Sequence, residues 1–114
     1  MKQWDIFTWE FPEGRHPAVI VSHPARIAAK PTVNVLLCSS QRVRRAAEVN
    51  EVILDESDGL DWATLCKCDL LYDVPKPDLT ERRGSVSPIR ATIWRRRMGE
   101  TEPRRSVKSA FGTS

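Results

Sequence analysis

The 114-residue sequence lacks the marks of several protein classes. It contains no run of 18 apolar residues, so no segment is a candidate membrane span. Its first residues lack the apolar stretch of a signal peptide, and we expect a cytoplasmic protein. Its three cysteines are an odd number, which argues against a disulfide framework and favours a reducing compartment. It also lacks a glycine-rich loop of the kind that cradles phosphates.

The sequence is equally poor in metal-binding patterns. A structural zinc site needs four ligands, usually in paired Cys knuckles, whereas here the only close pair is Cys66 and Cys68, with Cys38 far away in sequence. We therefore expect three buried thiols in strands, and neither a metal site nor a cofactor. The acidic residues at 55–61 fit the calcium-loop pattern poorly, and a solvated turn is the simpler interpretation.

The charge is unevenly distributed along the chain. Residues 82–114 carry nine Lys or Arg against two Glu, whereas residues 1–81 carry nine against thirteen Asp or Glu. A one-sided basic end is typical of proteins that bind an anionic partner such as nucleic acid. A solvated tail next to an exposed helix face would produce the same pattern.

Short segments rich in β-branched, aromatic and apolar residues predict five strands separated by turn residues. They cover residues 4–11, 17–21, 32–38, 51–54 and 63–71, with 72–74 as an extension of the last. The first two form a hairpin whose five-residue loop is 12–16. Strands this short and closely spaced favour a mainly β fold with short helices, a small antiparallel barrel or strongly bent sheet.

Two helical segments complete the predicted fold. Residues 25–29 form a single turn between the second and third strands. Residues 88–98 form a C-terminal helix, capped by a serine and ended by a glycine. Its docking face is Ile89, Ile93 and Trp94, and its basic residues point mainly outward: Arg90, Arg95, Arg96 and Arg97. We expect one domain over residues 1–99 and a flexible basic tail over 100–114.

Candidate chemistry lies around the second and third strands. Arg15 and His16 place a guanidinium, which can bind phosphate, and an imidazole at the start of the second strand. Ser39 and Ser40 follow the end of the third strand. We expect the two groups to lie at opposite ends of the sheet if these strands pair antiparallel, and to meet if the strands are parallel or cross in a barrel. The simpler alternative is that His16 is a solvated loop residue.

Several segments together resemble one family of proteins. Residues 14–22 read Gly-Arg-His-Pro-Ala-Val-Ile-Val-Ser and are similar to a G-x-R-P-x-V-V-V-S segment of that family. Residues 4–6, 32–41 and 59–65 resemble further segments in the same order and spacing. Over residues 3–98 the chain thereby resembles the MazF/PemK (Kid-like) toxins of type II toxin–antitoxin systems.

The resemblance implies an SH3-like barrel, usually a homodimer, and a metal-independent, sequence-selective endoribonuclease that cuts single-stranded RNA. In this chemistry the 2′-hydroxyl attacks the neighbouring phosphate, which requires a base, a cation and an acid. A small cognate antitoxin would neutralise the protein. The resemblance assigns Arg15, His16 and Ser39 as catalytic residues, and the residues expected to contact RNA are Ser40, Gln41, Arg42 and Lys67.

The sequence departs from the family pattern at one position. The family typically has an arginine directly before the proline of the second strand, where this chain has His16, with Arg15 one residue earlier. Either His16 acts as acid or base with Arg15 on the phosphate, or the barrel is catalytically inactive and binds RNA or a protein partner. Some proteins of this fold poison DNA gyrase instead, which is a third alternative.

Overall fold

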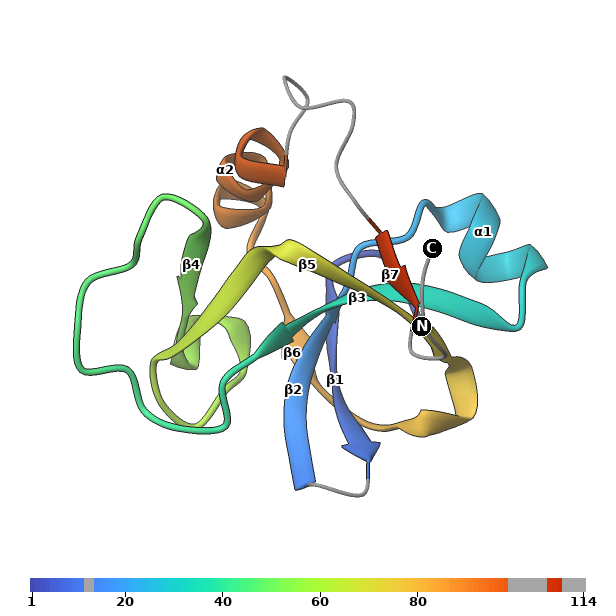
Figure 1. The fold of residues 1–114 in the computed structure, drawn as a ribbon, viewed down its shortest axis with the longest axis horizontal. Coiled ribbons are helices and arrows are strands. Elements are labelled where there is room, and N and C mark those ends of the chain that lie inside the picture. Colours follow the sequence, from blue (N-terminus) through green and yellow to red (C-terminus); the bar gives the residue numbers. More distant parts are fainter. Residues whose placement is uncertain (12–13, 99–106, 110–114) are drawn as a thin grey trace.

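A computed structural model describes residues 1–11, 14–98 and 107–109. Within this part, one strongly bent sheet contains all seven strands in the order β4-β5-β3-β2-β1-β6, with β7 beside β5 (Figure 1). Every pairing is antiparallel except that of β5 with β7. The strands are β1 (Asp5–Phe11), β2 (Gly14–Ile20), β3 (Thr32–Cys38), β4 (Glu51–Leu54), β5 (Thr64–Pro75), β6 (Leu79–Ser85) and β7 (Val107–Ser109).

The helices are short and lie at the ends of the sheet (Figure 1). They are α1 (Pro24–Ala29) and α2 (Pro88–Met98), with 3-10 turns η1 (Glu56–Asp58) and η2 (Lys76–Asp78). None of the helices in the described ranges is both long enough and apolar enough to cross a membrane. The expected helical turn and C-terminal helix are thus confirmed, and the mainly β fold class is confirmed as an open half-barrel.

Two expectations about the strands are wrong. The predicted five-residue loop 12–16 does not exist as such, because β2 already begins at Gly14 and pairs Arg15 with Glu10 and His16 with Trp9. The strand β6 was not expected, since its sequence is Leu-Thr-Glu-Arg-Arg-Gly-Ser and most of its residues are exposed or half-buried. An edge strand needs few apolar residues, so a charged sequence does not exclude it.

Irregular pairings explain the curvature of the sheet. The β1–β6 register shifts between Ile6 and Phe7 and again between Thr8 and Trp9. The β3–β5 register shifts between residues 36 and 38. Such irregularities increase the local twist and bend the strands, which curls a flat sheet toward a barrel.

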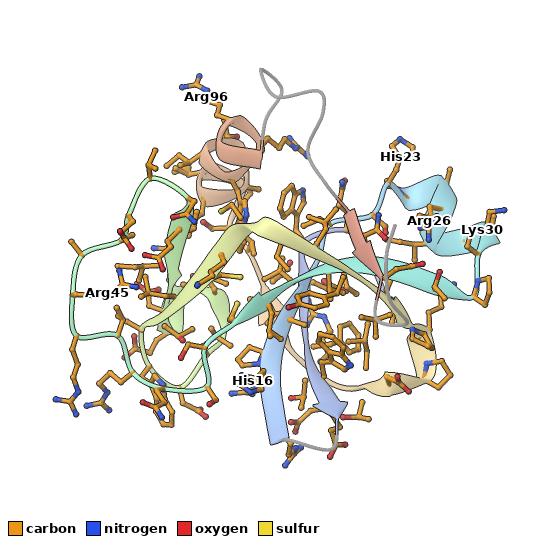
Figure 2. All side chains as sticks on the ribbon, in the orientation of Figure 1. His16, His23, Arg26, Lys30, Arg45 and Arg96 are labelled. Carbon is orange, nitrogen blue, oxygen red and sulfur yellow. The ribbon has the colours of Figure 1, made fainter. Side chains whose placement is uncertain are left out.

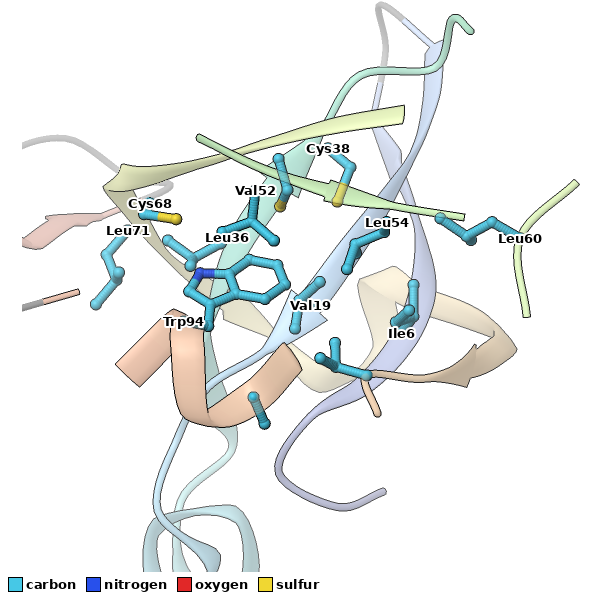
Figure 3. Close-up of a cluster of buried hydrophobic side chains, with 13 residues drawn as sticks. Ile6, Val19, Leu36, Cys38, Val52, Leu54, Leu60, Cys68, Leu71 and Trp94 are labelled. Atoms are coloured by element: carbon cyan, nitrogen blue, oxygen red, sulfur yellow. The ribbon is translucent and has the colours of Figure 1, made fainter. Parts of the chain in front are cut away.

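Hydrophobic side chains are buried on both faces of the sheet. On β2, Val19 belongs to one cluster, whereas its neighbours Ala18 and Ile20 belong to the other, as expected from side chains that alternate along a strand. The first cluster surrounds the fully buried Trp94 of α2 (Figure 3). The second half of β2 and most of β3 are nearly continuous apolar runs because both of their faces are covered.

The predicted docking face of α2 is only partly right. Trp94 is fully buried and shares its face with Ala91, three residues earlier, whereas Ile89 and Ile93 are 79% and 44% exposed. The large indole decides which face of the helix is turned inward, because it carries the most apolar area. Arg90, expected to point outward, instead binds Asp55 and Asp58.

A close contact, which we call the seam, joins the η1 turn to β6 and α2. Gly59 has a φ of +98°, and a Cβ there would lie 2.6 Å from the carbonyl oxygen of Arg83. A Cβ on Gly84 would collide with the carbonyl oxygen of Asp58. The buried carboxylate of Asp58 accepts hydrogen bonds from the backbone N–H groups of Asp55 and Ser87. The seam thus connects the two ends of the sheet, which no strand pairing joins in the described residues.

Most of the predicted tail, residues 100–114, lies outside the described residues. Of this segment, Val107–Ser109 forms β7 and pairs in parallel with Leu71, Tyr72 and Asp73 of β5. The division into a domain at 1–99 and a flexible tail stays a prediction.

Candidate active site

The start of β2 and the end of β3 lie side by side. The two strands are antiparallel, with Ala18 opposite Leu37 and Ile20 opposite Val35. The expectation that antiparallel pairing would separate His16 from Ser39 is wrong, because the first residues of one antiparallel strand lie beside the last residues of the other. His16 Nδ1 lies 3.2 Å from the carbonyl oxygen of Cys38, directly before Ser39.

This contact decides which nitrogen of the His16 ring can take up a proton. A carbonyl oxygen only accepts hydrogen bonds, so Nδ1 carries a hydrogen and donates this bond to the carbonyl oxygen of Cys38. In the neutral ring Nε2 is then the unprotonated nitrogen. The backbone of β3 therefore orients His16 in the form that a general base needs.

His16 opens onto a cavity of about 350 Å³ at the surface of the sheet, which we call the first cavity. Its other lining residues come from β3, β4, β5 and the segment before β4 (Figure 2 labels His16 and Arg45). Apolar and aromatic side chains and charged groups both contribute to the lining, which consists of Leu37, Cys38, Ser39, Arg45, Glu51, Leu65, Lys67 and Tyr72. Such a mixture suits a ligand that has both a flat apolar part and an anionic part.

Ser39 lies between this cavity and a second one. The second cavity has a volume of about 200 Å³, and its lining includes Arg15, Ser39, Ser40, Trp62 and Arg83. Among the described residues, only Ser39 lines both. Its hydroxyl oxygen accepts a hydrogen bond from the backbone N–H of Gln41 at 3.1 Å. A ligand that spans the two cavities would therefore pass over Ser39.

Arg15 and His16 do not share a cavity. They are neighbours on β2, and side chains alternate between the two sides of a strand. The Arg15 guanidinium lies 3.4 Å from the carboxylate of Glu10 and 4.0 Å from that of Glu81, with 63% of its side chain exposed. The structure thus brings His16 to one side of Ser39 and Arg15 to the other.

Of the four residues expected to contact RNA, one lines each cavity and two line neither. Lys67 is exposed and lines the first cavity, and Ser40 lines the second. Arg42 places its guanidinium 5.7 Å from the ring centre of Trp62. The exposed side chain of Gln41 lines neither cavity, although its carbonyl oxygen accepts a hydrogen bond from the hydroxyl of Thr64.

Thr64 was not expected at the site. Its side chain is buried, and its hydroxyl lies within hydrogen-bond distance of the carbonyl oxygens of Ser39 at 2.6 Å and Gln41 at 3.0 Å. The turn is held further by a bond from the N–H of Ser39 to the carbonyl oxygen of Leu65. These contacts fix the backbone on both sides of the Ser39 hydroxyl.

An ion pair at the rim of the first cavity was also not expected. Glu51 is buried and binds Arg45 through two bonds of 2.7 and 2.9 Å. The hydrogen bond from Arg45, and then that from the backbone N–H of Glu48, lower the pKa of Glu51 from 4.5 to about 2. In the sequence, this buried ion pair is indicated by a single feature, which is a glutamate at the start of the apolar strand 51–54. We call residues 39–50, which this pair holds, the rim segment.

The cysteines are where the sequence predicts them. Cys38, Cys66 and Cys68 are all buried free thiols, and Lys67 lies on the opposite, exposed face of β5. Burial, followed by a hydrogen bond with Cys38, raises the pKa of Cys66 well above its usual value. In the described part of the chain, no group of three or more His, Cys, Asp or Glu side chains is arranged to hold a metal ion.

The half-barrel and the paired cavities define a small SH3-like β protein with an open surface site. The sequence model of the PemK-like, MazF-like toxins of type II toxin–antitoxin systems matches residues 2–98. The chain belongs to this family. The curated proteins that were compared contain no match to the chain.

Solved structures show the same fold at low sequence identity. The chain is similar to the toxin MazF-mt6 of Mycobacterium tuberculosis, with 20% identity and a TM-score of 0.72 over 83% of this chain and 92% of that chain. It is also similar to an endoribonuclease of a mycobacterial species in complex with its cognate antitoxin, with 20% identity and a TM-score of 0.74 over 86% and 90%. A MazE–MazF structure from Deinococcus radiodurans has 17% identity and a TM-score of 0.69 over 87% and 91%.

Proposed function

We propose that this protein is a toxin that acts as a metal-independent, sequence-selective endoribonuclease on single-stranded RNA. The observation that carries the proposal is the placement of Ser39 between an oriented imidazole on one side and a guanidinium on the other. When a 2′-hydroxyl attacks its neighbouring phosphate, the reaction requires a base and a cation of this kind. The sequence also places the chain in a family of toxins.

The chemistry needs two proton transfers and a phosphate held in place. The 2′-oxygen forms a bond to phosphorus while the bond from phosphorus to the 5′-oxygen breaks, which leaves a 2′,3′-cyclic phosphate and a 5′-hydroxyl. His16 Nε2 takes the proton of the 2′-hydroxyl, and water in the open cavity returns a proton to the 5′-oxygen. The Ser39 hydroxyl and Lys67 stabilise the charge that develops on the phosphate.

Arg15 joins the phosphate by leaving its carboxylate partners. Exposed ion pairs such as that of Arg15 with Glu10 are worth about 0–1 kcal/mol, so a phosphate competes with them readily. A guanidinium presents paired N–H donors that match two phosphate oxygens. Substrate binding would thereby bring a cation to the side of Ser39 opposite His16.

The partners follow from the family and the relatives. We infer that a cognate antitoxin neutralises the protein in the cytoplasm, as a relative of similar fold is an endoribonuclease in complex with its cognate antitoxin. We also infer a homodimer. A chain of 114 residues has room for shallow cavities only, and a second copy would extend them into a groove.

The test is cleavage of single-stranded RNA by the purified protein in EDTA. We expect products with 2′,3′-cyclic phosphate ends, and a loss of about 10²- to 10⁴-fold in rate for His16→Ala. The chain has one other histidine, His23, whose Nδ1 caps α1, so His23→Asn is the matched control and should cleave normally. No cleavage in EDTA, or full activity of His16→Ala, would refute the proposal.

A non-cleaving barrel that binds RNA is the second candidate. The observation that favours it is the ion pairing of Arg15 with Glu10 and Glu81, away from the cavity of His16. Salt-sensitive RNA binding without any product in the same assay would select this alternative.

A further inference from the structure

Trp62 is unusual among the tryptophans of this chain. It is 38% exposed, whereas Trp4 is half-buried, Trp9 is 7% exposed and Trp94 is fully buried. Its ring lines the second cavity beside Ser39, together with the apolar side chains of Pro17 and Leu60. Tryptophan rings are enriched at binding interfaces, where one end of the ring is covered and the other is in water.

Arg42 adds a positive charge beside this surface. Its guanidinium lies 5.7 Å from the Trp62 ring centre, within the range of a cation–π contact. The rim segment that carries Arg42 is itself fixed by hydrogen bonds from Thr64 to the carbonyl oxygens of Ser39 and Gln41. The backbone next to Arg42 is therefore fixed, and the guanidinium lies beside the indole without a ligand.

We propose that the second cavity is a nucleobase subsite, in which one unpaired RNA base stacks on Trp62 while Arg42 contacts the adjoining phosphate. The inference rests on the proposed function, because it places this base next to the phosphate that lies over Ser39. A cavity of about 200 Å³ is smaller than the sites that hold drug-sized ligands and suits a single base. Only single strands offer such a base, since bases in a duplex are already stacked.

The arginines at this cavity supply donors for an anionic ligand, and the exposed indole favours one that carries flat bases. Arg15 and Arg83 line the cavity, and Arg42 lies beside its Trp62 ring. Two of these arginines already have carboxylate partners, since Arg83 lies 3.3 Å from Asp61 and Arg15 pairs with Glu10 and Glu81. The combination of a stacking ring with flanking arginines is how proteins bind single-stranded nucleic acid. Stacking tolerates any base, so Trp62 sets affinity and register, and the first cavity is left to select sequence.

The experiment measures binding without cleavage. The probe is a set of eight-nucleotide RNAs of mixed sequence with 2′-O-methyl sugars, which cannot attack their own phosphates. We expect Trp62→Leu to weaken binding about 10- to 100-fold for all sequences, and Trp62→Phe to retain most of the affinity. Ile93→Ala, at the similarly exposed Ile93 on α2, is the matched control and should bind normally.

Fluorescence locates the contact. RNA should quench tryptophan emission of the wild type to a saturating level, and this quenching should be lost in Trp62→Phe. An RNA with one abasic position should bind wild type and Trp62→Leu equally well when that position faces Trp62. Arg42→Ala should lower the salt dependence of binding by about one released counterion.

The outcomes separate this inference from the proposed function. Intact quenching with no cleavage of ordinary RNA would refute the nuclease and leave the subsite standing. Cleavage with equal RNA affinity of Trp62→Leu and wild type would overturn the subsite alone. Quenching by a polyglutamate peptide but not by RNA would overturn it as well and assign the surface to a protein partner.

Discussion

Glu51 and Asp58 are both buried carboxylates that bind an arginine, yet they hold together different parts of the molecule. Glu51 binds Arg45 and the N–H of Glu48, all within six residues of itself. Asp58 binds Arg90 and the N–H of Ser87, which are about 30 residues away. The first carboxylate organises the rim segment beside the first cavity, and the second closes the seam.

The two carboxylates should differ in what they affect: Asp58 mainly the stability of the fold, and Glu51 mainly the shape of the candidate site. A contact between distant segments exists only in the folded chain, so its loss reduces the free energy of unfolding directly. A contact within one short segment sets the local shape of that segment and leaves the sheet intact. Changes at the seam should therefore cost more unfolding free energy than changes in the rim segment, which should mainly alter the site.

The largest effect is expected for Asp58→Ala. The change leaves Arg90 without its most buried partner and removes the acceptor of two backbone N–H groups, which should cost about 3 kcal/mol of unfolding free energy. Urea denaturation followed by circular dichroism measures this loss. Asp61→Ala removes an equal charge from an exposed pair and should cost about 0.5 kcal/mol or less. Equal losses in the two variants would contradict the distinction.

Gly84→Ala should be the next most damaging change. The new methyl group would collide with the carbonyl oxygen of Asp58, and backbone cannot move aside as a side chain can. Overpacking of this kind costs about 1–3 kcal/mol, and we expect the upper end. Thermal unfolding measures it. Gly14→Ala has open space around its Cβ but a φ of +147°, so it isolates backbone strain and should cost about 1 kcal/mol. The seam explanation fails if Gly14→Ala is the worse variant.

Glu51→Gln should change how stability depends on pH. Its carboxylate has a pKa of about 2 in the folded protein and 4.5 when unperturbed, so its contribution is complete above pH 4.5 and disappears as the pH falls toward 2. The variant should be less stable at neutral pH and should lose less stability between these two values. Urea midpoints across that range test this. Glu48→Gln, at an exposed side chain, should give a curve parallel to that of the wild type.

Much of this fold could be predicted from the sequence because its strands are apolar runs with β-branched residues. The strand β6 could not, since an edge strand carries charged residues that resemble a loop. The site was only partly predictable. Residues 12–16 were predicted to be a loop, whereas residues 14–16 belong to β2. Side chains alternate along a strand, so Arg15 and His16 lie on opposite sides of it. Glu51 and Arg45 meet across a segment without periodicity, and such a pairing leaves no pattern in the sequence.

Arg45→Lys should give the smallest effect and the sharpest test of the comparison. Lysine keeps the charge but lacks the paired N–H donors with which the guanidinium binds both carboxylate oxygens of Glu51. One of these oxygens also accepts a hydrogen bond from the backbone N–H of Glu48. The rim segment should open more often, and hydrogen exchange at Glu48 should accelerate about two- to tenfold with little change in unfolding free energy. Arg44→Lys, at an exposed neighbour in the same segment, is the control. If Arg45→Lys instead destabilised the fold as much as Asp58→Ala, the rim pair would belong to the folded core and would not be a local clamp.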